Sequence, residues 1–111
     1  AGIYWQDPHD NWAMKKGAGY NLTSATKLKF MARGDKGGEV VEFKAGGISG
    51  EYPDSFRAEA PIATLTPEWQ EFEIDVSGQD LSTVIGGFAF IISKEKNPDG
   101  AVIYIDDVRY E

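Results

Sequence analysis

Residues 101–111 read AVIYIDDVRYE, the stretch around which the rest of the chain is arranged. It is rich in β-branched and aromatic residues, which are enriched in strands. It follows NPDG at positions 97–100, where proline and glycine occupy places that a type I turn favours. The closing stretch is therefore predicted to be a β-strand.

Two adjacent aspartates, Asp106 and Asp107, interrupt this predicted strand. If Ile103 and Ile105 face the core, strict alternation next places Asp107 there, and a bulge near the pair is needed. In the alternative phase, the inner face consists of Asp106, Val102, Tyr104, Val108 and Tyr110. On both hypotheses a carboxylate lies at or near a buried surface, which is costly without a cation or hydrogen bonds. The pair is a candidate site; otherwise one aspartate is solvated and the other caps a turn or the bulge.

The composition of the chain excludes several classes of protein. The 111 residues suffice for one domain, 1–111, and 41% hydrophobic with 13% aromatic residues excludes a disordered chain. No apolar run is long enough to cross a bilayer. The net charge of −7, without a basic cluster, makes nucleic acid an unfavourable partner, whereas divalent cations and neutral ligands are compatible. Because cysteine is absent, disulfides and thiolate catalysis are excluded.

Alternation of apolar and polar residues marks the other strands. The cleanest case is 71–76, where alternate apolar residues point inward and acidic residues point to solvent. Further strands are predicted at 3–6, 62–65 and 88–93. The last of these is apolar on both faces, so it is predicted to be central in a sheet.

Residues 27–33 and 40–45 both alternate and flank a DKGG turn at 35–38. Their predicted inner faces consist of Leu28, Phe30 and Ala32, and of Val41, Phe43 and Ala45. The outer faces carry Lys27 and Lys29 on the first strand and Glu42 on the second, which suits an antiparallel pair. The two segments are therefore predicted to form a β-hairpin.

Two long segments, 7–20 and 46–60, are predicted to be loops, and 81–85 one short helical turn. Loops of this length in compact domains are usually functional or mobile. Several short strands without intervening helices indicate an all-β fold, an antiparallel two-sheet β-sandwich. The long loops favour a jelly roll.

Four segments together resemble the C-terminal half of galactose-binding-like β-jelly-roll modules, a group that includes many carbohydrate-binding modules of bacterial secreted enzymes and surface proteins. They are GGEVVEFKAGG (37–47), LTPEWQEFEIDVSGQDLS (65–82), IGGFAFII (85–92) and IYIDDVRYE (103–111). The opening IYWQDPHDNW is similar to a loop pattern of such modules. The resemblance is a diffuse pattern over most of the chain, and it implies a sugar-binding or adhesion module.

The resemblance also implies a structural calcium ion bound in part by a carboxylate of the closing strand. That carboxylate would be Asp106, with Asp107 as the neighbouring alternative. Calcium needs several hard oxygen ligands, and in related modules the others come largely from near the N-terminus. Related modules also have a first strand before the position that matches Ala1. We therefore expect an incomplete sandwich whose exposed sheet edge pairs with a second chain or another segment.

Sugar-binding sites usually combine aromatic platforms with polar groups, because pyranose C–H faces stack on rings while hydroxyls need hydrogen-bond partners. The aromatic candidates on or beside the predicted loops are Tyr4, Trp5, Trp12 and Tyr52. The polar candidates near them in sequence are Asp7, His9, Asn11 and Arg57. The structural alternative is that Trp5 and Trp12 cap the core under a long loop.

Catalytic patterns are weak in this sequence. The only histidine is His9, no strand-turn element carries a nucleophile motif, and no stretch singles out a pair of carboxylates. We therefore expect no enzyme, but a secreted module of an extracellular or cell-surface protein that binds a polysaccharide or glycan non-catalytically. The alternative is a structural or assembly module that forms oligomers or filaments through the open sheet edge.

Overall fold

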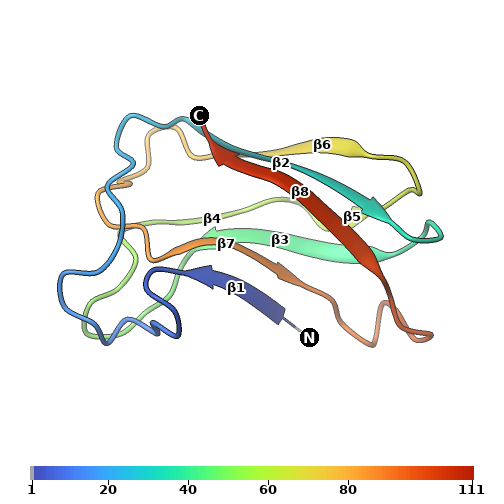
Figure 1. The fold of residues 1–111 in the computed structure, drawn as a ribbon, viewed down its shortest axis with the longest axis horizontal. Helices are drawn as coiled ribbons and strands as arrows, with labels where there is room; N and C mark the ends of the chain where they lie inside the picture. Colours follow the sequence, from blue (N-terminus) through green and yellow to red (C-terminus); the bar gives the residue numbers. More distant parts are fainter. Residues whose placement is uncertain (1) are drawn as a thin grey trace.

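A computed structural model describes residues 2–111. In this range two antiparallel sheets pack face to face and there is no helix, so no helical membrane span occurs in it (Figure 1). The predicted all-β sandwich is confirmed, whereas the jelly-roll connectivity stays a prediction. The strands are β1 (Gly2–Gln6), β2 (Lys27–Gly34), β3 (Val40–Gly46), β4 (Arg57–Glu59), β5 (Ala63–Thr64), β6 (Gln70–Asp75), β7 (Gly86–Ile91) and β8 (Ile103–Tyr110).

The larger sheet has the strand order β1-β7-β3-β4, and β5 pairs with the start of β3. β7 corresponds to the strand predicted at 88–93, and it lies between β1 and β3. Its central position is therefore confirmed. Central strands have neighbours on both sides and packing on one or both faces, which explains why apolar residues dominate β7.

The smaller sheet has the order β6-β2-β8. Alternate residues of β2 are buried, and its outer residues from Lys27 to Met31 lie opposite acidic residues of β6. Lys27 contacts Glu73 at 3.6 Å and Lys29 contacts Glu111 at 3.1 Å. Lys27 and Lys29 do not lie opposite Glu42, as the predicted antiparallel pair requires, because Glu42 lies in the other sheet.

The predicted hairpin between β2 and β3 is wrong. β2 pairs with β6 and β8, while β3 pairs with β7, β4 and β5, so the turn after β2 carries the chain from one sheet to the other. The inner faces predicted for both strands are nevertheless confirmed. Alternation cannot separate two strands that pair from two strands that face each other, since both arrangements bury the same side chains.

The core lies between the sheets and is centred on three fully buried phenylalanines, Phe30, Phe43 and Phe88. Phe30 of the smaller sheet lies 4.5 Å from Phe43 and 4.8 Å from Phe88, measured between ring centroids. Burial of such side chains is the main stabilising contribution in a domain of this size. The packed core fixes how the two sheets face each other.

β8 carries the bulge that one of the two hypotheses for the closing strand required. Its register against β2 shifts between Asp106 and Arg109, and Asp107 has a φ of 54°. The extra residue lets Ile105 and Tyr110 both pack against the core. The expectation that a carboxylate lies at a buried surface is wrong. Asp106 and Asp107 are both exposed, because the bulge turns the pair toward solvent.

The loop of residues 7–19 is folded against one end of the larger sheet. Ala13 is buried with Ile48 and Ile85 in a second, smaller apolar cluster. The amide of Asp7 donates a hydrogen bond to the carbonyl of Ile85 (2.8 Å). These contacts give the loop a defined course beside β1 and β7.

Two local predictions are wrong. Residues 81–85 form no helical turn, since Val84 instead bridges to Tyr20. The predicted loop 46–60 contains the short strand β4, which pairs with the end of β3. Both segments take their conformation from partners distant in sequence, which no local pattern reveals.

Candidate functional site

One row of side chains crosses the outer face of the larger sheet. Tyr4 of β1 lies opposite Ala89 of β7, which lies opposite Lys44 of β3. Lys44 in turn lies opposite Glu59 of β4. Residues paired in this way project from the same face of a sheet. Tyr4 and Lys44 therefore flank the small side chain of Ala89 on the face turned away from the core.

The 7–19 loop places Trp12 beside this row. Trp12 meets Tyr4 edge to face, with ring centroids 5.4 Å apart and the planes at 68°. Its indole N–H donates to the carboxylate of Asp10 at 3.2 Å. Trp12 is still 51% exposed. A large, partly exposed ring held by two contacts presents a fixed apolar surface to solvent.

The loop is fixed by the buried side chain of Asn11. Its amide donates to the carbonyl of Asp7 at 2.8 Å, and its oxygen accepts the amide of Ala13 at 3.1 Å. Gln6 donates its side-chain amide to the carbonyl of Asn11 at 3.0 Å. Because Asn11 and Ala13 are fully buried, Trp12 between them is directed outward. Trp12 is thus positioned before a ligand arrives.

A hollow of about 330 Å³ lies beside the two aromatic rings. It is lined by the aromatic residues Tyr4 and Trp12 and by the cationic residues Lys44 and Arg57. Gly46, Gly47 and Ser49 also line it. A Cβ at Gly46 would lie 2.4 Å from the carbonyl oxygen of Phe56, so only glycine fits there. An apolar platform thus faces hydrogen-bond donors across a shallow, preformed surface.

The cationic groups of the hollow differ in their partners. Arg57 lies 3.9 Å from Glu59, and both side chains are mostly exposed. Among residues 2–111 Lys44 has no carboxylate within ion-pair distance. An exposed ion pair at this distance is weak, so the guanidinium can exchange Glu59 for a ligand oxygen. Both cations are therefore available as donors to a ligand.

Three of the eight predicted sugar-binding residues meet in this hollow: Tyr4, Trp12 and Arg57. They come from β1, the 7–19 loop and β4. The structural alternative, in which Trp5 and Trp12 cap the core, is wrong for Trp12, which packs on the outer face of the sheet. Trp5, in contrast, does pack on the core side.

Trp5 lies on the opposite face of β1 from Tyr4. Its ring centroid is 4.8 Å from that of Phe88 and 6.2 Å from that of Phe90, on the core side of the sheet. The prediction that Trp5 joins Tyr4 and Trp12 in one site is therefore wrong. Neighbouring residues of a strand project from opposite faces, so Tyr4 and Trp5 cannot share a surface.

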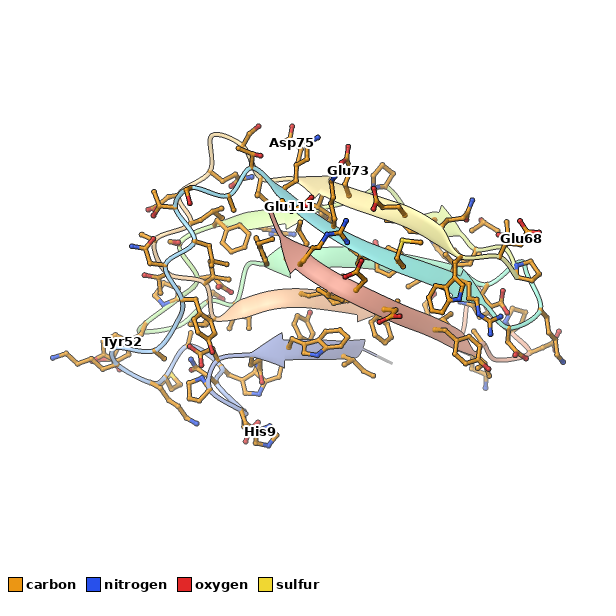
Figure 2. All side chains as sticks on the ribbon, turned by 45° about the horizontal axis from the view of Figure 1, so that its top comes forward. His9, Tyr52, Glu68, Glu73, Asp75 and Glu111 are labelled. Atoms are coloured by element: carbon orange, nitrogen blue, oxygen red, sulfur yellow. The ribbon has the colours of Figure 1, made fainter. Side chains whose placement is uncertain are left out.

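The polar residues predicted between 7 and 11 shape the loop and lie outside the hollow. The carboxylate of Asp7 accepts the amide of Gly19 at 3.0 Å, and Asn11 is fully buried. His9 is exposed, and its backbone carbonyl accepts a hydrogen bond from the ammonium group of Lys15 at 3.0 Å. Figure 2 shows His9 and Tyr52 at separate places of the loop region. None of the four predicted residues Asp7, His9, Asn11 and Tyr52 lines the hollow.

Lys44 and Ser49 line the hollow but were not among the predicted site residues. Alternation does place Lys44 on the outer face of its strand, which is the only signal that the sequence offers. Lys44 lies near Tyr4 because a single strand, β7, separates β3 from β1. That order is set by pairings far apart in the chain.

The predicted metal ligands do not form a calcium site by themselves. The carboxylate of Asp107 contacts Arg109 at 2.9 Å, and that of Asp106 accepts the amide of Asp107 at 2.8 Å. No group of three or more His, Cys, Asp or Glu side chains suited to a metal occurs within residues 2–111. Calcium prefers six to eight oxygen ligands. The pair offers too few, and calcium binding stays a prediction that rests on the resemblance.

Comparison with known proteins gives no family. The sequence matches no model of a known protein family, and no curated protein is significantly similar to it. The resemblance to galactose-binding-like modules therefore stays a prediction.

Proposed function

We propose that the protein is a non-catalytic carbohydrate-binding module of an extracellular or cell-surface protein, and that it binds a polysaccharide or glycan on the outer face of the larger sheet. The observation that carries the proposal is the pair Tyr4 and Trp12, which forms an exposed aromatic wall opposite Lys44 and Arg57. The resemblance to carbohydrate-binding modules supports the same class of ligand.

Recognition would combine stacking and hydrogen bonding. The C–H face of a pyranose ring packs on Trp12, while its hydroxyl oxygens accept hydrogen bonds from Lys44 and Arg57. The site is shallow and open, and it binds without chemical change. Because the loop and sheet hold the rings in place beforehand, little conformational entropy is lost on binding. We expect the modest affinity that is typical of open sites.

The test is binding of a panel of polysaccharides, measured by glycan array and affinity electrophoresis. We expect Trp12→Ala to weaken binding by about tenfold or more, which corresponds to about 1.4 kcal/mol. Trp69→Ala is the matched control, because Trp69 is also a partly exposed tryptophan but contacts Arg33 instead. Wild-type protein that binds no glycan, or equal losses in both variants, would contradict the proposal.

A structural or assembly module is the second candidate function. It is favoured by the free outer edge of β8, which pairs with β2 on one side alone within residues 2–111. A strand from a second chain or from another segment would extend the smaller sheet there. Concentration-dependent assembly in sedimentation experiments, without glycan binding, would favour this function over the first.

A further inference from the structure

The core-side face of β1 is left uncovered. Ile3 and Trp5 pair with Phe90 and Phe88 of β7 and project from the same face as these core residues. Yet Ile3 is 52% and Trp5 47% exposed. β1 contacts β7, its neighbour in the larger sheet. No strand of the smaller sheet packs closely on β1 (Figure 1). One strand of the larger sheet therefore has no counterpart in the opposite layer.

The border of the smaller sheet lies next to this uncovered face. β8 forms the border, and Ile103, Ile105 and Tyr110 point from it toward the core but are only partly buried. Backbone groups on the free side of β8 have no strand partner within residues 2–111. A strand at about 4.8 Å from β8 would lie over β1 and would cover Ile3 and Trp5.

A hollow of about 300 Å³ lies at one end of the same surface. It is lined mainly by apolar groups, among them Trp5, Tyr20, Leu22 and Tyr110. Tyr20 is 62% exposed. Together with Ile3, these side chains form a continuous apolar strip beside a strand edge, which is the arrangement that accepts an added strand with bulky side chains.

The space over β1 is wide enough for one added strand, which limits the kind of partner. β8 lies against β7, since the hydroxyl of Tyr110 donates a hydrogen bond to the carbonyl of Gly87, and the larger sheet continues past this point by one strand, β1. If a second folded copy paired its β8 side by side with this β8, its own larger sheet would have to occupy the space that β1 fills. A single strand without a second layer of its own meets no such obstacle. The partner is therefore an extended peptide and not another folded copy.

Charge further defines the partner. Asp106 and Asp107 lie exposed on the free border, and only Asp107 has an ion pair, with Arg109. Acidic residues and a bulge at an edge discourage pairing with other sheets, and most of all with acidic ones. A peptide with lysine or arginine beside Asp106 replaces charge repulsion at this edge by attraction. The net charge of −7 also favours a basic partner.

We propose that the strip of Ile3, Trp5, Tyr20 and Tyr110, together with the free edge of β8, binds one extended peptide strand of a partner chain, with apolar side chains alternating with basic ones. The strand pairs with β8, its apolar side chains cover Ile3 and Trp5, and a bulky one enters the hollow. This inference uses the same free edge of β8 as the second candidate function, but it replaces assembly with other folded copies by binding of one peptide strand. It is independent of glycan binding, which uses the other face of β1.

The test uses short synthetic peptides that alternate isoleucine with lysine or, as the charge control, isoleucine with glutamate. We expect the lysine peptide to bind at least about tenfold more tightly, and to slow hydrogen exchange of amides in β8. Ile3→Lys and Trp5→Lys should each remove binding, which gives two variants in case one impairs folding. Trp12→Ala, on the other face of the sheet, should leave it unchanged.

Three results would overturn the inference: no binding of the lysine peptide, equal binding of both peptides, or protection of amides in another strand. Sedimentation of the protein alone should show a monomer, because a second folded copy does not fit the strip. Loss of glycan binding in Trp12→Ala with peptide binding retained separates this inference from the carbohydrate proposal.

Discussion

Phe30 and Phe43 meet ring to ring, with centroids 4.5 Å apart, although they stand on strands of different sheets. Both side chains are fully buried. Their contact crosses the interior of the sandwich and therefore links the two layers directly.

Phe30→Ala should lower the free energy of unfolding by about 3–5 kcal/mol, because it leaves a cavity between the sheets. Phe30→Leu retains most of the apolar volume and should cost about 1–2 kcal/mol. Urea unfolding followed by fluorescence measures both. If the two substitutions cost the same, the interior is not tightly packed at this contact.

Asp54 connects two loops through backbone amides. Its carboxylate accepts the amides of Ile48 at 3.0 Å, Ile85 at 2.7 Å and Gly86 at 3.1 Å. Asp54→Ala leaves these donors unpaired and should cost about 2–4 kcal/mol. Asp99→Ala, at an exposed turn, is the control and should change stability little. A small effect of Asp54→Ala in thermal unfolding would mean that water replaces the carboxylate.

Asp107 has a positive φ of 54°, in a region that β-branched residues avoid. Asp107→Val should therefore lower the free energy of unfolding by about 1–2 kcal/mol. Asp107→Asn also loses the charge that faces Arg109, but asparagine tolerates this backbone conformation, so its cost should stay below about 1 kcal/mol. Equal costs for both substitutions in chemical unfolding would show that the bulge relaxes readily.

The buried Glu39 makes stability depend on pH. Its carboxylate accepts the amide of Lys36 at 2.9 Å, which lowers the pKa of Glu39 below its usual value, although burial opposes the shift. A lowered folded-state pKa stabilises the protein above the unfolded-state pKa of about 4.3, and this contribution is lost as the pH falls through the folded-state value. Glu39→Gln should thus reduce stability at neutral pH, and the difference from wild type should shrink at acid pH.

Melting temperatures of wild type and Glu39→Gln across the acid range check this dependence. Glu51→Gln is the control, because Glu51 is exposed on a loop. Its melting curve should follow that of the wild type at every pH. Parallel curves for Glu39→Gln and wild type would show that the amide of Lys36 does not stabilise the ionised carboxylate.

Calcium is tested by its effect on the melting temperature. If the ion binds near Asp106, millimolar calcium chloride raises the melting temperature above that in a chelator, since a ligand that binds only the folded state stabilises it. Asp106→Asn should remove this difference, whereas Asp99→Asn, at an exposed turn, should retain it. An unchanged melting temperature in the chelator would remove calcium from the proposed function.

The sequence predicted most strands and nearly all of their inner faces. It also required a bulge if Ile103 and Ile105 face the core, and β8 has that bulge beside Asp107. These features follow from the direction of side chains along one strand. They need no knowledge of which strands pair.

The candidate site was predicted only in part. Tyr4, Trp12 and Arg57 were identified as aromatic and polar residues near loops, and the structure brings them together. Trp5 is predicted with them because it lies beside the same predicted loop, but it projects from the other face of the sheet. Lys44 was missed because its closeness depends on strand order.

The sequence by itself determined an all-β chain with defined inner and outer faces, because the two-residue period is a local property. Only the tertiary structure decided that β2 and β3 face each other across the core, since burial of Phe30 and Phe43 is satisfied equally by pairing or by facing. It likewise decided the hollow and the uncovered strip, because both form where segments distant in the chain meet.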